Sequence, residues 1–215
     1  MEINDILSHI DHTLLKATAT TAEIDALCQQ AQKYHTASVC IPACYVEYAA
    51  AKYPGLNICT VVGFPLGYST MAIKCSEAVG AIKSGANEID MVVNLTDVKN
   101  GKFDAVTSEI KALKYVCGEK VLKVIIETCY LTEEEKIKLC ECVTEAGADY
   151  IKTSTGFGTA GADIEDIRLF KKYIGENVKI KAAGGVKSRE DLEMFLNEGC
   201  DRIGTSSAVK LLIGE

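Results

Sequence analysis

Gly147-Ala148-Asp149-Tyr150-Ile151-Lys152 begins with a glycine and a small residue and then enters an apolar, strand-forming run. The same plan recurs in Gly85-Ala86-Asn87-Glu88-Ile89-Asp90 and in Gly199-Cys200-Asp201-Arg202-Ile203-Gly204. Such a glycine ends a helix in a left-handed conformation, so each copy predicts a helix followed by a strand. The fifth position after the glycine carries a lysine, an acid and a glycine, at equivalent points of three strands.

Eight apolar runs rich in Val, Ile and Leu alternate with helix signals along the 215 residues. Continuous apolar runs are typical of parallel strands covered on both faces. Eight βα units predict a single-domain (β/α)8 TIM barrel over residues 1–215. The alternative, a doubly wound open sheet, lacks support because no G-x-G-x-x-G motif follows the first strand. The runs span residues 8–15, 37–42, 57–64, 88–94, 121–128, 149–155, 178–184 and 201–205.

The helix signals between these runs include two capping boxes, Thr20-x-x-Glu23 and Thr132-x-x-Glu135. Apolar residues at helical spacing between positions 72 and 82 indicate a further helix. Its predicted buried face consists of Ala72, Cys75, Val79 and Ile82.

Composition and charge exclude several classes of function. The net charge is -7 and no Lys/Arg run occurs, so we expect no nucleic-acid partner. No apolar run has the length of a membrane span, and residues 1–5 lack signal-peptide features, which predicts a cytoplasmic protein. The ten cysteines are scattered through apolar segments, as buried free thiols would be. Their spacings match no common zinc motif, so no metal is expected.

Charged residues interrupt three of the apolar strands. Because strand residues alternate between faces, Asp90, Lys152 and Lys181 are predicted to face the barrel interior, and Glu127 is a fourth candidate. Few acids are present to neutralise the charges of the two lysines, which favours a functional site over a set of structural ion pairs. Structural ion pairs inside the barrel and a solvent-facing edge-strand lysine remain the alternatives.

A pair of buried lysines has a specific chemical use. A free lysine has a pKa of ~10.4, so roughly one in 2,500 is a neutral nucleophile at pH 7. A second ammonium group ~5 Å away contributes about 3 kcal/mol towards deprotonation at an effective dielectric near 20, and desolvation adds more. Lysines activated in this way form Schiff bases with carbonyl substrates. Charge alone does not say which lysine is the nucleophile.

Two glycine-containing loops predict an anion site. Gly184-Gly185 follows the seventh strand, and Gly204-Thr205-Ser206-Ser207 follows the eighth and opens a short helix. Glycines let a backbone approach a ligand closely, and TIM barrels often bind phosphate between these two loops. Asp11-His12-Thr13 in the first strand is either catalytic or part of a buried polar network.

These features together resemble the deoxyribose-phosphate aldolase family, which are class I aldolases of barrel fold, from end to end of the chain. The resemblance is carried by Ile10-Asp11-His12-Thr13-Leu14-Leu15-Lys16, Ser38-Val39-Cys40-Ile41-Pro42, Val61-Val62-Gly63-Phe64-Pro65-Leu66-Gly67, Glu88-Ile89-Asp90-Met91-Val92-Val93-Asn94, Lys152-Thr153-Ser154-Thr155-Gly156-Phe157, Lys181-Ala182-Ala183-Gly184-Gly185-Val186 and Gly204-Thr205-Ser206-Ser207.

The resemblance implies reversible cleavage of the sugar phosphate 2-deoxy-D-ribose 5-phosphate to D-glyceraldehyde 3-phosphate and acetaldehyde. Lys152 would form the Schiff base, and Asp90 and Lys181 would donate and accept protons, with Lys181 also lowering the pKa of the nucleophile. No metal or organic cofactor is implied, and the assembly would be a homodimer. Substrate and phosphate contacts are implied for Gly184, Gly185, Gly204, Ser206, Ser207, Thr155, Cys40 and Leu15.

Two departures from the family pattern stand out. Some relatives carry a phosphate-binding lysine where this chain has Phe157, and many continue into a tail that ends in tyrosine. The rival interpretations are another Schiff-base barrel enzyme of transaldolase or keto-acid aldolase type, a metal-dependent sugar-phosphate epimerase, and a non-catalytic sensor of sugar phosphates.

Overall fold

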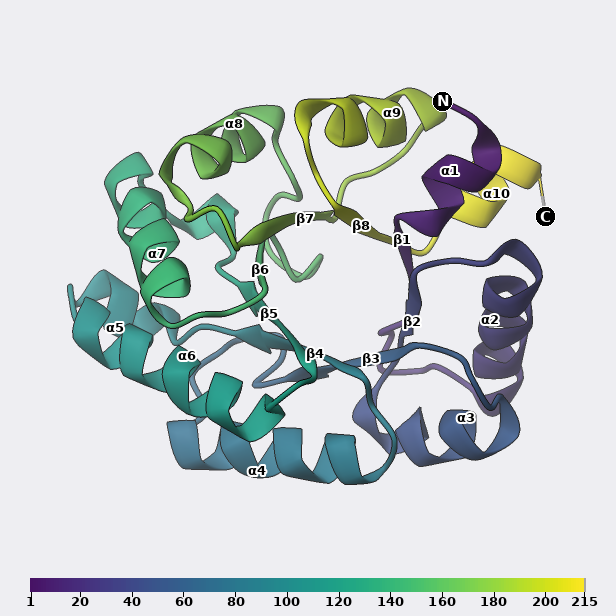
Figure 1. Ribbon diagram of the computed structural model, residues 1–215, viewed down its shortest axis with the longest axis horizontal. Helices are drawn as coiled ribbons and strands as arrows, with labels where there is room; N and C mark the ends of the chain where they lie inside the picture. The colour runs from purple at the N-terminus through teal and green to yellow at the C-terminus, as the bar shows by residue number, and fades with distance from the viewer. Residues whose placement is uncertain (215) are drawn as a thin grey trace.

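The computed structural model describes residues 1–214, in which eight parallel strands close into a barrel in sequence order (Figure 1). The predicted TIM barrel is confirmed, and each strand lies within one of the eight predicted runs. The strands are β1 (Ile10–Thr13), β2 (Ser38–Cys40), β3 (Ile58–Val62), β4 (Glu88–Val92), β5 (Val121–Ile125), β6 (Tyr150–Lys152), β7 (Lys179–Ala183) and β8 (Arg202–Thr205).

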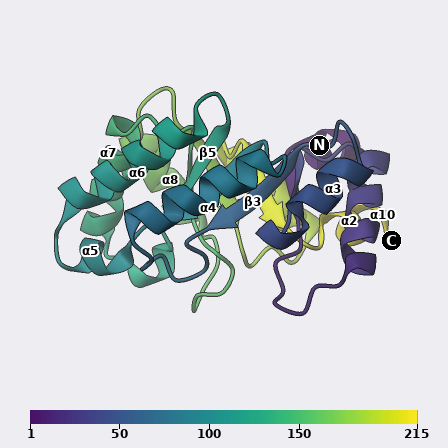
Figure 2. The same cartoon turned by 90° about the horizontal axis from the view of Figure 1, so that it is seen from below.

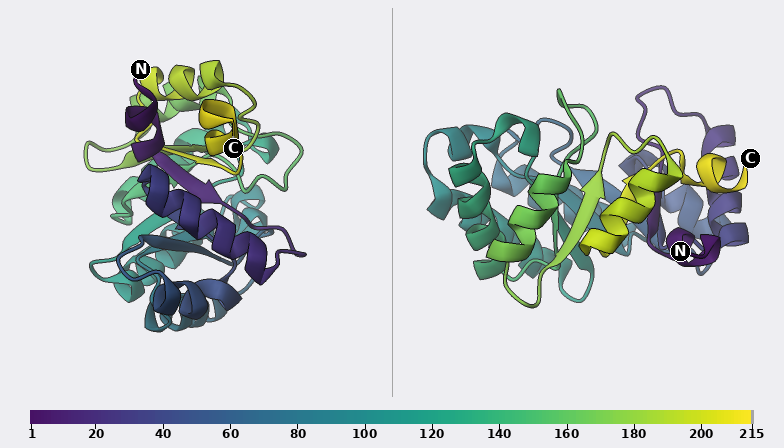
Figure 3. Two further views of the ribbon diagram at one scale, coloured as in Figure 1. Left: turned by 90° about the vertical axis from the view of Figure 1, so that its right-hand side faces the viewer. Right: turned by 90° about the horizontal axis from the view of Figure 1, so that it is seen from above.

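Helices surround the barrel (Figure 1). The first and last helices, α1 and α10, lie side by side (Figures 1 and 3). The helices are α1 (Ile3–Ser8), α2 (Thr21–Tyr34), α3 (Val46–Lys52), α4 (Met71–Lys83), α5 (Leu95–Lys99), α6 (Phe103–Cys117), α7 (Glu133–Glu145), α8 (Ile164–Tyr173), α9 (Arg189–Glu198) and α10 (Ala208–Ile213), with short 3-10 turns η1 (Ala43–Tyr45) and η2 (Thr128–Tyr130). None of the helices within residues 1–214 is long and apolar enough to cross a lipid bilayer.

Local sequence accounts for where several helices begin and end. The predicted capping boxes at the starts of α2 and α7 are both formed, and Ser188 makes a third at α9. The repeated glycines have φ values of 111° at Gly85, 71° at Gly147 and 111° at Gly199, as the left-handed helix ends require. Each chain segment then turns directly into a barrel strand.

The predicted face of α4 is confirmed only in part: Cys75 and Ile82 are half-buried against the hydrophobic core, but Ala72 is exposed. Val79 is exposed, and α4 instead buries Lys74, Ala78 and Ala81. Lys74 is accommodated because its ammonium group forms an ion pair with Glu109 at 2.8 Å and donates to the Val92 carbonyl at 2.7 Å. Apolar spacing could not reveal this helix face, since a buried, paired lysine occupies it.

The strands separate an apolar layer from a polar one. In β4, Ile89 and Met91 belong to the hydrophobic core, while the alternating Glu88 and Asp90 form ion pairs inside the barrel. The loops after β1 and β6 extend from the same end of the barrel (Figure 2), which is the carboxyl end of the strands. This end carries the site described next.

Candidate active site

Strand register brings the three predicted charged residues into one buried cluster. Lys152 pairs with Lys181 in the β6–β7 register, and Asp90 lies two strands away on β4. Oδ2 of Asp90 accepts a hydrogen bond of 2.7 Å from Nζ of Lys152 and another of 2.7 Å from Nζ of Lys181. The two ammonium nitrogens are therefore at most twice 2.7 Å, or 5.4 Å, apart.

Further charged groups extend this cluster. Lys123 lies 3.0 Å from Asp90 and also pairs with Glu88, while Arg202 bridges Asp11 and Glu88. Three carboxylates and four cations thus form one connected network. Its members are Asp11, Glu88, Asp90, Lys123, Lys152, Lys181 and Arg202.

The charge count of this network corrects the expectation that two lysines stand among few acids. With every group ionised, the four cations exceed the three carboxylates by one charge. The network becomes neutral when one amine loses its proton, which favours a neutral amine inside the barrel because net charge is costly there. The two further acids, Asp11 and Glu88, reach the cluster from β1 and from the same strand as Asp90.

The network holds Asp90 and Lys181 in their ionised forms. Burial alone would raise the pKa of Asp90, but the charges of Lys123, Lys152 and Lys181 outweigh burial and hold that pKa well below its usual range. Burial alone would lower the pKa of Lys181, but Asp11 and Asp90 raise it above its ordinary value. At neutral pH the free protein therefore has a carboxylate at Asp90 and an ammonium group at Lys181.

A cavity of about 290 Å³ opens above the cluster, between the loops that follow β1, β6, β7 and β8. Lys152 and Lys16 are its cationic lining residues, and none of the described carboxylates lines it. Of the three buried lysines in the network, Lys152 alone reaches the cavity. The lining residues are Thr13, Leu14, Leu15, Lys16, Lys152, Thr155, Gly156, Phe157, Ala183, Gly184, Gly185, Val186, Gly204, Thr205, Ser206 and Ser207.

Most of the predicted ligand contacts are in this lining, namely Leu15, Thr155, Gly184, Gly185, Gly204, Ser206 and Ser207. Cys40 is not; it lies fully buried on β2, near Asp90. Gly184 and Gly185 have φ values of 79° and 76°, which other residues adopt only with strain. Their backbone forms one wall of the cavity, so a ligand would meet peptide groups there.

Glu127 supports the rim of the cavity and does not join the charged network. It is buried just after β5, and its carboxylate accepts hydrogen bonds from the backbone N–H of Thr155, at 3.0 Å, and from the Thr155 hydroxyl. Glu127 has a left-handed φ of 54°, which is unusual for a residue with a side chain. Next along this loop, the ring of Phe157 packs edge-on against Phe64 with centroids 5.3 Å apart.

Two site residues, Lys123 and Lys16, were not predicted as such from the sequence, although Lys123 left a signal. Lys123 interrupts the apolar run of β5 just as Lys152 interrupts that of β6. Asp11, for which two roles were left open, belongs to the buried network. Lys16 directly follows the first strand run and had no distinguishing pattern, because its position at the cavity depends on how the loop folds back.

Gly204 serves the cluster as well as the cavity. A Cβ at this position would lie 3.0 Å from Cε of Lys181, so the missing side chain leaves room for that lysine. We expect Gly204→Ala to displace the Lys181 ammonium group and to lower kcat roughly tenfold or more, since small misplacements of catalytic groups are costly. Gly80→Ala is the control, because a Cβ there meets nothing within 4 Å. Equal activity of the two variants would contradict this role.

The family model described as DeoC/LacD family aldolase matches residues 6–210. The chain is 66% identical to the deoxyribose-phosphate aldolase of Clostridium botulinum strain Eklund 17B over 212 residues, covering 98% of this chain and 96% of the relative. It is 58% identical over 216 residues to the Streptococcus pyogenes serotype M4 protein of the same name, covering 100% and 97%.

Solved structures agree with these sequence matches. The tetrameric deoxyribose phosphate aldolase from Aeropyrum pernix superposes with a TM-score of 0.91 at 32% identity, covering 98% of this chain and 91% of that one. Orotidine 5'-phosphate decarboxylase from Pyrococcus horikoshii, at 12% identity and a TM-score of 0.67, shares the fold, covering 93% and 96%. The resemblance found in the sequence is confirmed, and the chain belongs to the DeoC/LacD family of aldolases.

Proposed function

We propose that the protein is a deoxyribose-phosphate aldolase that uses Lys152 as its Schiff-base lysine. The observation that carries this proposal is the position of Lys152. Its Nζ donates a hydrogen bond to Asp90 in the buried network, and the residue also lines the cavity together with the glycine and serine loops. Lys181 contacts two carboxylates and Lys152 only one, and of these two lysines Lys152 alone lines the cavity.

The reaction would begin at the cavity floor. Neutral Lys152 attacks the C1 aldehyde of open-chain 2-deoxy-D-ribose 5-phosphate, and loss of water gives a protonated imine that acts as an electron sink. The phosphate would lie against Gly184, Gly185, Ser206 and Ser207, which line the same cavity as Lys152. This arrangement fixes both ends of the sugar before any carbon–carbon bond breaks.

Asp90 and Lys181 would move the protons. Asp90, acting through water and Lys181, takes the proton of the C3 hydroxyl, and the C2–C3 bond breaks to release D-glyceraldehyde 3-phosphate. The enamine left on Lys152 is then protonated at carbon and hydrolysed to acetaldehyde. The hydrogen bonds of 2.7 Å from both lysines to one oxygen of Asp90 provide a short route for these transfers.

Reductive trapping tests the proposal. Acetaldehyde followed by borohydride should leave an ethyl group on Lys152, detected by mass spectrometry of the peptide that contains it. The buried neighbours Lys123 and Lys181 are internal controls and should stay unmodified. An ethyl group found elsewhere, with none on Lys152, would refute the assignment.

Lys16 would supply countercharge to the phosphate, because Phe157 contributes none. Lys16 is exposed and contacts Glu23 at 3.4 Å, so its effect should be modest. We expect Lys16→Gln to raise KM for the phosphorylated sugar about fivefold while leaving KM for unphosphorylated 2-deoxyribose unchanged. Lys111→Gln, a comparably exposed lysine paired with Glu145 far along the chain, is the control. Equal effects on both sugars would contradict the phosphate role.

Rival activities make different predictions. A transaldolase-like or keto-acid aldolase would prefer longer ketose or carboxylate substrates in competition, and a metal-dependent epimerase would lose activity with a chelator. A sensor would bind sugar phosphate without forming an imine. Homodimer assembly and a cytoplasmic location stay predictions; light scattering of the purified protein tests the first.

A further inference from the structure

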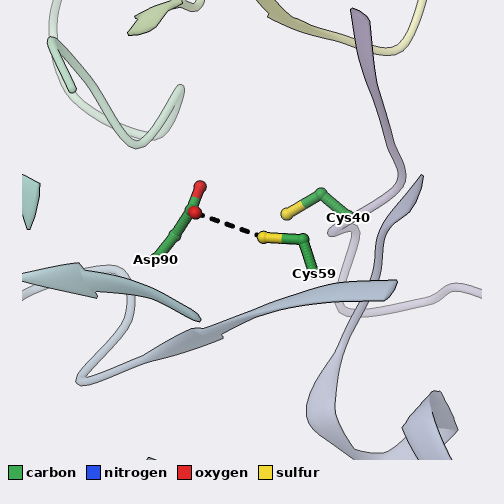
Figure 4. A group of neighbouring side chains, drawn as sticks. All are labelled: Cys40, Cys59 and Asp90. Carbon is green, nitrogen blue, oxygen red and sulfur yellow. Dashed lines mark hydrogen bonds between the residues drawn. The ribbon is translucent and has the colours of Figure 1, made fainter. Parts of the chain in front are cut away.

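Cys40 and Cys59 face each other across the β2–β3 pair, beside the proposed catalytic acid. They are register partners in adjacent parallel strands, and both are fully buried. Their sulfur atoms and an oxygen of Asp90 lie within 4.8 Å of one another. Figure 4 shows the two thiols and the carboxylate pointing towards one another, and Sγ of Cys59 donates to Oδ1 of Asp90 at 3.1 Å.

The backbone geometry of this pair suits a disulfide. Neighbouring strands lie about 4.8 Å apart, and disulfides join residues whose Cα atoms are about 4.4–6.8 Å apart. Because the two residues are in register and their side chains point to the same side of the sheet, the bond would need side-chain rotation more than strand movement.

We propose that Cys40 and Cys59 form an oxidation site, in which a hydroperoxide oxidises Cys40 and Cys59 converts the product to an intramolecular disulfide. The disulfide would lower aldol activity until a dithiol reductant restores both thiols. The chemical class of the modifying agent is a small neutral peroxide, which is smaller than the sugar phosphate that the cavity would admit.

The two thiols differ in a way that orders the chemistry. The pKa of Cys40 is lowered from its ordinary value, because the adjacent Cys59 and the charges of Lys181 and Lys152 together outweigh burial and the opposing charge of Asp90. Burial raises the pKa of Cys59 well above its ordinary value. Thiolates are the reactive form of cysteine, so Cys40 is the attacking thiol and Cys59 the resolving one.

Oxidation of the cysteine pair proceeds in two steps. The Cys40 thiolate attacks one oxygen of hydrogen peroxide, the O–O bond breaks, and hydroxide leaves with the Cys40 sulfenic acid formed. The Cys59 sulfur attacks the Cys40 sulfur, its proton passes to Asp90, and the S–O bond breaks to release hydroxide. Proton transfer from Asp90 and from solvent turns both hydroxides into water. Two thiols thus lose two electrons to one peroxide, which becomes two waters.

The same three side chains have donor types that could hold a soft metal cation, but their surroundings oppose one. Asp90 already contacts the ammonium groups of Lys123 at 3.0 Å and of Lys152 and Lys181 at 2.7 Å each. A divalent cation would enter a site crowded with positive charge, whereas a neutral peroxide meets no such barrier. The surroundings therefore favour oxidation over metal binding.

The disulfide would affect catalysis through Asp90, because Cys59 would no longer have a thiol proton to donate. The disulfide removes the hydrogen bond from Cys59 to Oδ1, so that among the described residues Lys123 remains the hydrogen-bond donor to that oxygen. We expect aldol activity to fall about tenfold, because the free-energy contribution of a hydrogen bond to a charged group corresponds to a rate factor of about this size.

The test uses the full chain with Cys44→Ser, which removes the exposed thiol that shares a tryptic peptide with Cys40. In this background residues 34–52 contain only Cys40 and residues 53–74 only Cys59. After hydrogen peroxide and alkylation of remaining thiols, mass spectrometry should find these two peptides joined, and dithiothreitol should restore both peptides and activity. Adding Cys117→Ser, a buried thiol elsewhere, should leave the joined peptides unchanged.

Adding Cys59→Ser instead should abolish the joined peptides and let dimedone label Cys40, because its sulfenic acid then has no resolving thiol. The proposal is overturned if Cys59 remains alkylatable while Cys40 is oxidised, or if the joined protein keeps full activity. The activity readout rests on the proposed function, but the peptide readout does not. Untreated protein without aldolase activity that still forms the joined peptides would count against the proposed function and not against the oxidation site.

Discussion

Lys152→Met will lower kcat/KM for 2-deoxy-D-ribose 5-phosphate by about four orders of magnitude or more, because it deletes the nucleophile and with it every covalent intermediate. The folded structure should persist. Asp90 keeps hydrogen bonds to Lys123 at 3.0 Å and to Lys181 at 2.7 Å, and the network is left with three cations for three carboxylates. No buried charge loses its last partner, which is the change that strongly destabilises proteins.

Thermal unfolding and circular dichroism separate chemistry from stability in this variant. Methionine fills most of the space of the lysine side chain, so a loss of activity in this variant cannot be attributed to a cavity in the core. Borohydride trapping with acetaldehyde should yield no ethylated peptide from Lys152→Met, while Gly80→Ala should trap like the natural chain. Residual activity above about 1% with a trapped lysine elsewhere would assign the Schiff base to another residue.

Much of the fold was predictable because its signals are local. The glycine at 147 ends a helix whatever the rest of the chain does, and the capping boxes at Thr20 and Thr132 begin two others. The placing of Tyr150, Lys152 and Ser154 on one face of their strand follows from strand alternation alone. Each of these inferences needs only a few neighbouring residues.

The composition of the charged network was not predictable in the same way. Glu88 and Arg202 are 114 residues apart in the chain, and their contact depends on how the barrel closes and on the register of its strands. Nothing in either segment indicates that pairing. The prediction of poorly neutralised lysines therefore had the right sign of charge but underestimated the number of both acids and cations in the network.

Lys181→Leu will cut the rate severely and will move the acid limb of the kcat/KM–pH profile to higher pH. The raised pKa of Lys181 means that its ammonium group stays charged throughout the usual assay range, so it repels the proton on Lys152 at every pH tested. A unit charge ~5 Å away at an effective dielectric near 20 is worth about 3 kcal/mol, or roughly two pH units. Without it the protonated form of Lys152 is more stable, and a higher pH is needed to obtain the neutral amine.

Asp90 acts on the acid limb of Lys181→Leu in the same direction as the loss of the Lys181 charge. Its carboxylate accepts hydrogen bonds from both lysines, and removing Lys181 leaves that negative charge more available to Lys152, which pushes the limb in the same direction. Lys181→Arg keeps the positive charge, so its limb should stay close to that of the natural chain even if the rate falls. Asp11 retains Arg202 and Lys123 as partners in Lys181→Leu, so the fold should survive. A Lys181→Leu profile that coincides with the Lys181→Arg profile would disprove the electrostatic coupling while leaving Lys152 as the nucleophile.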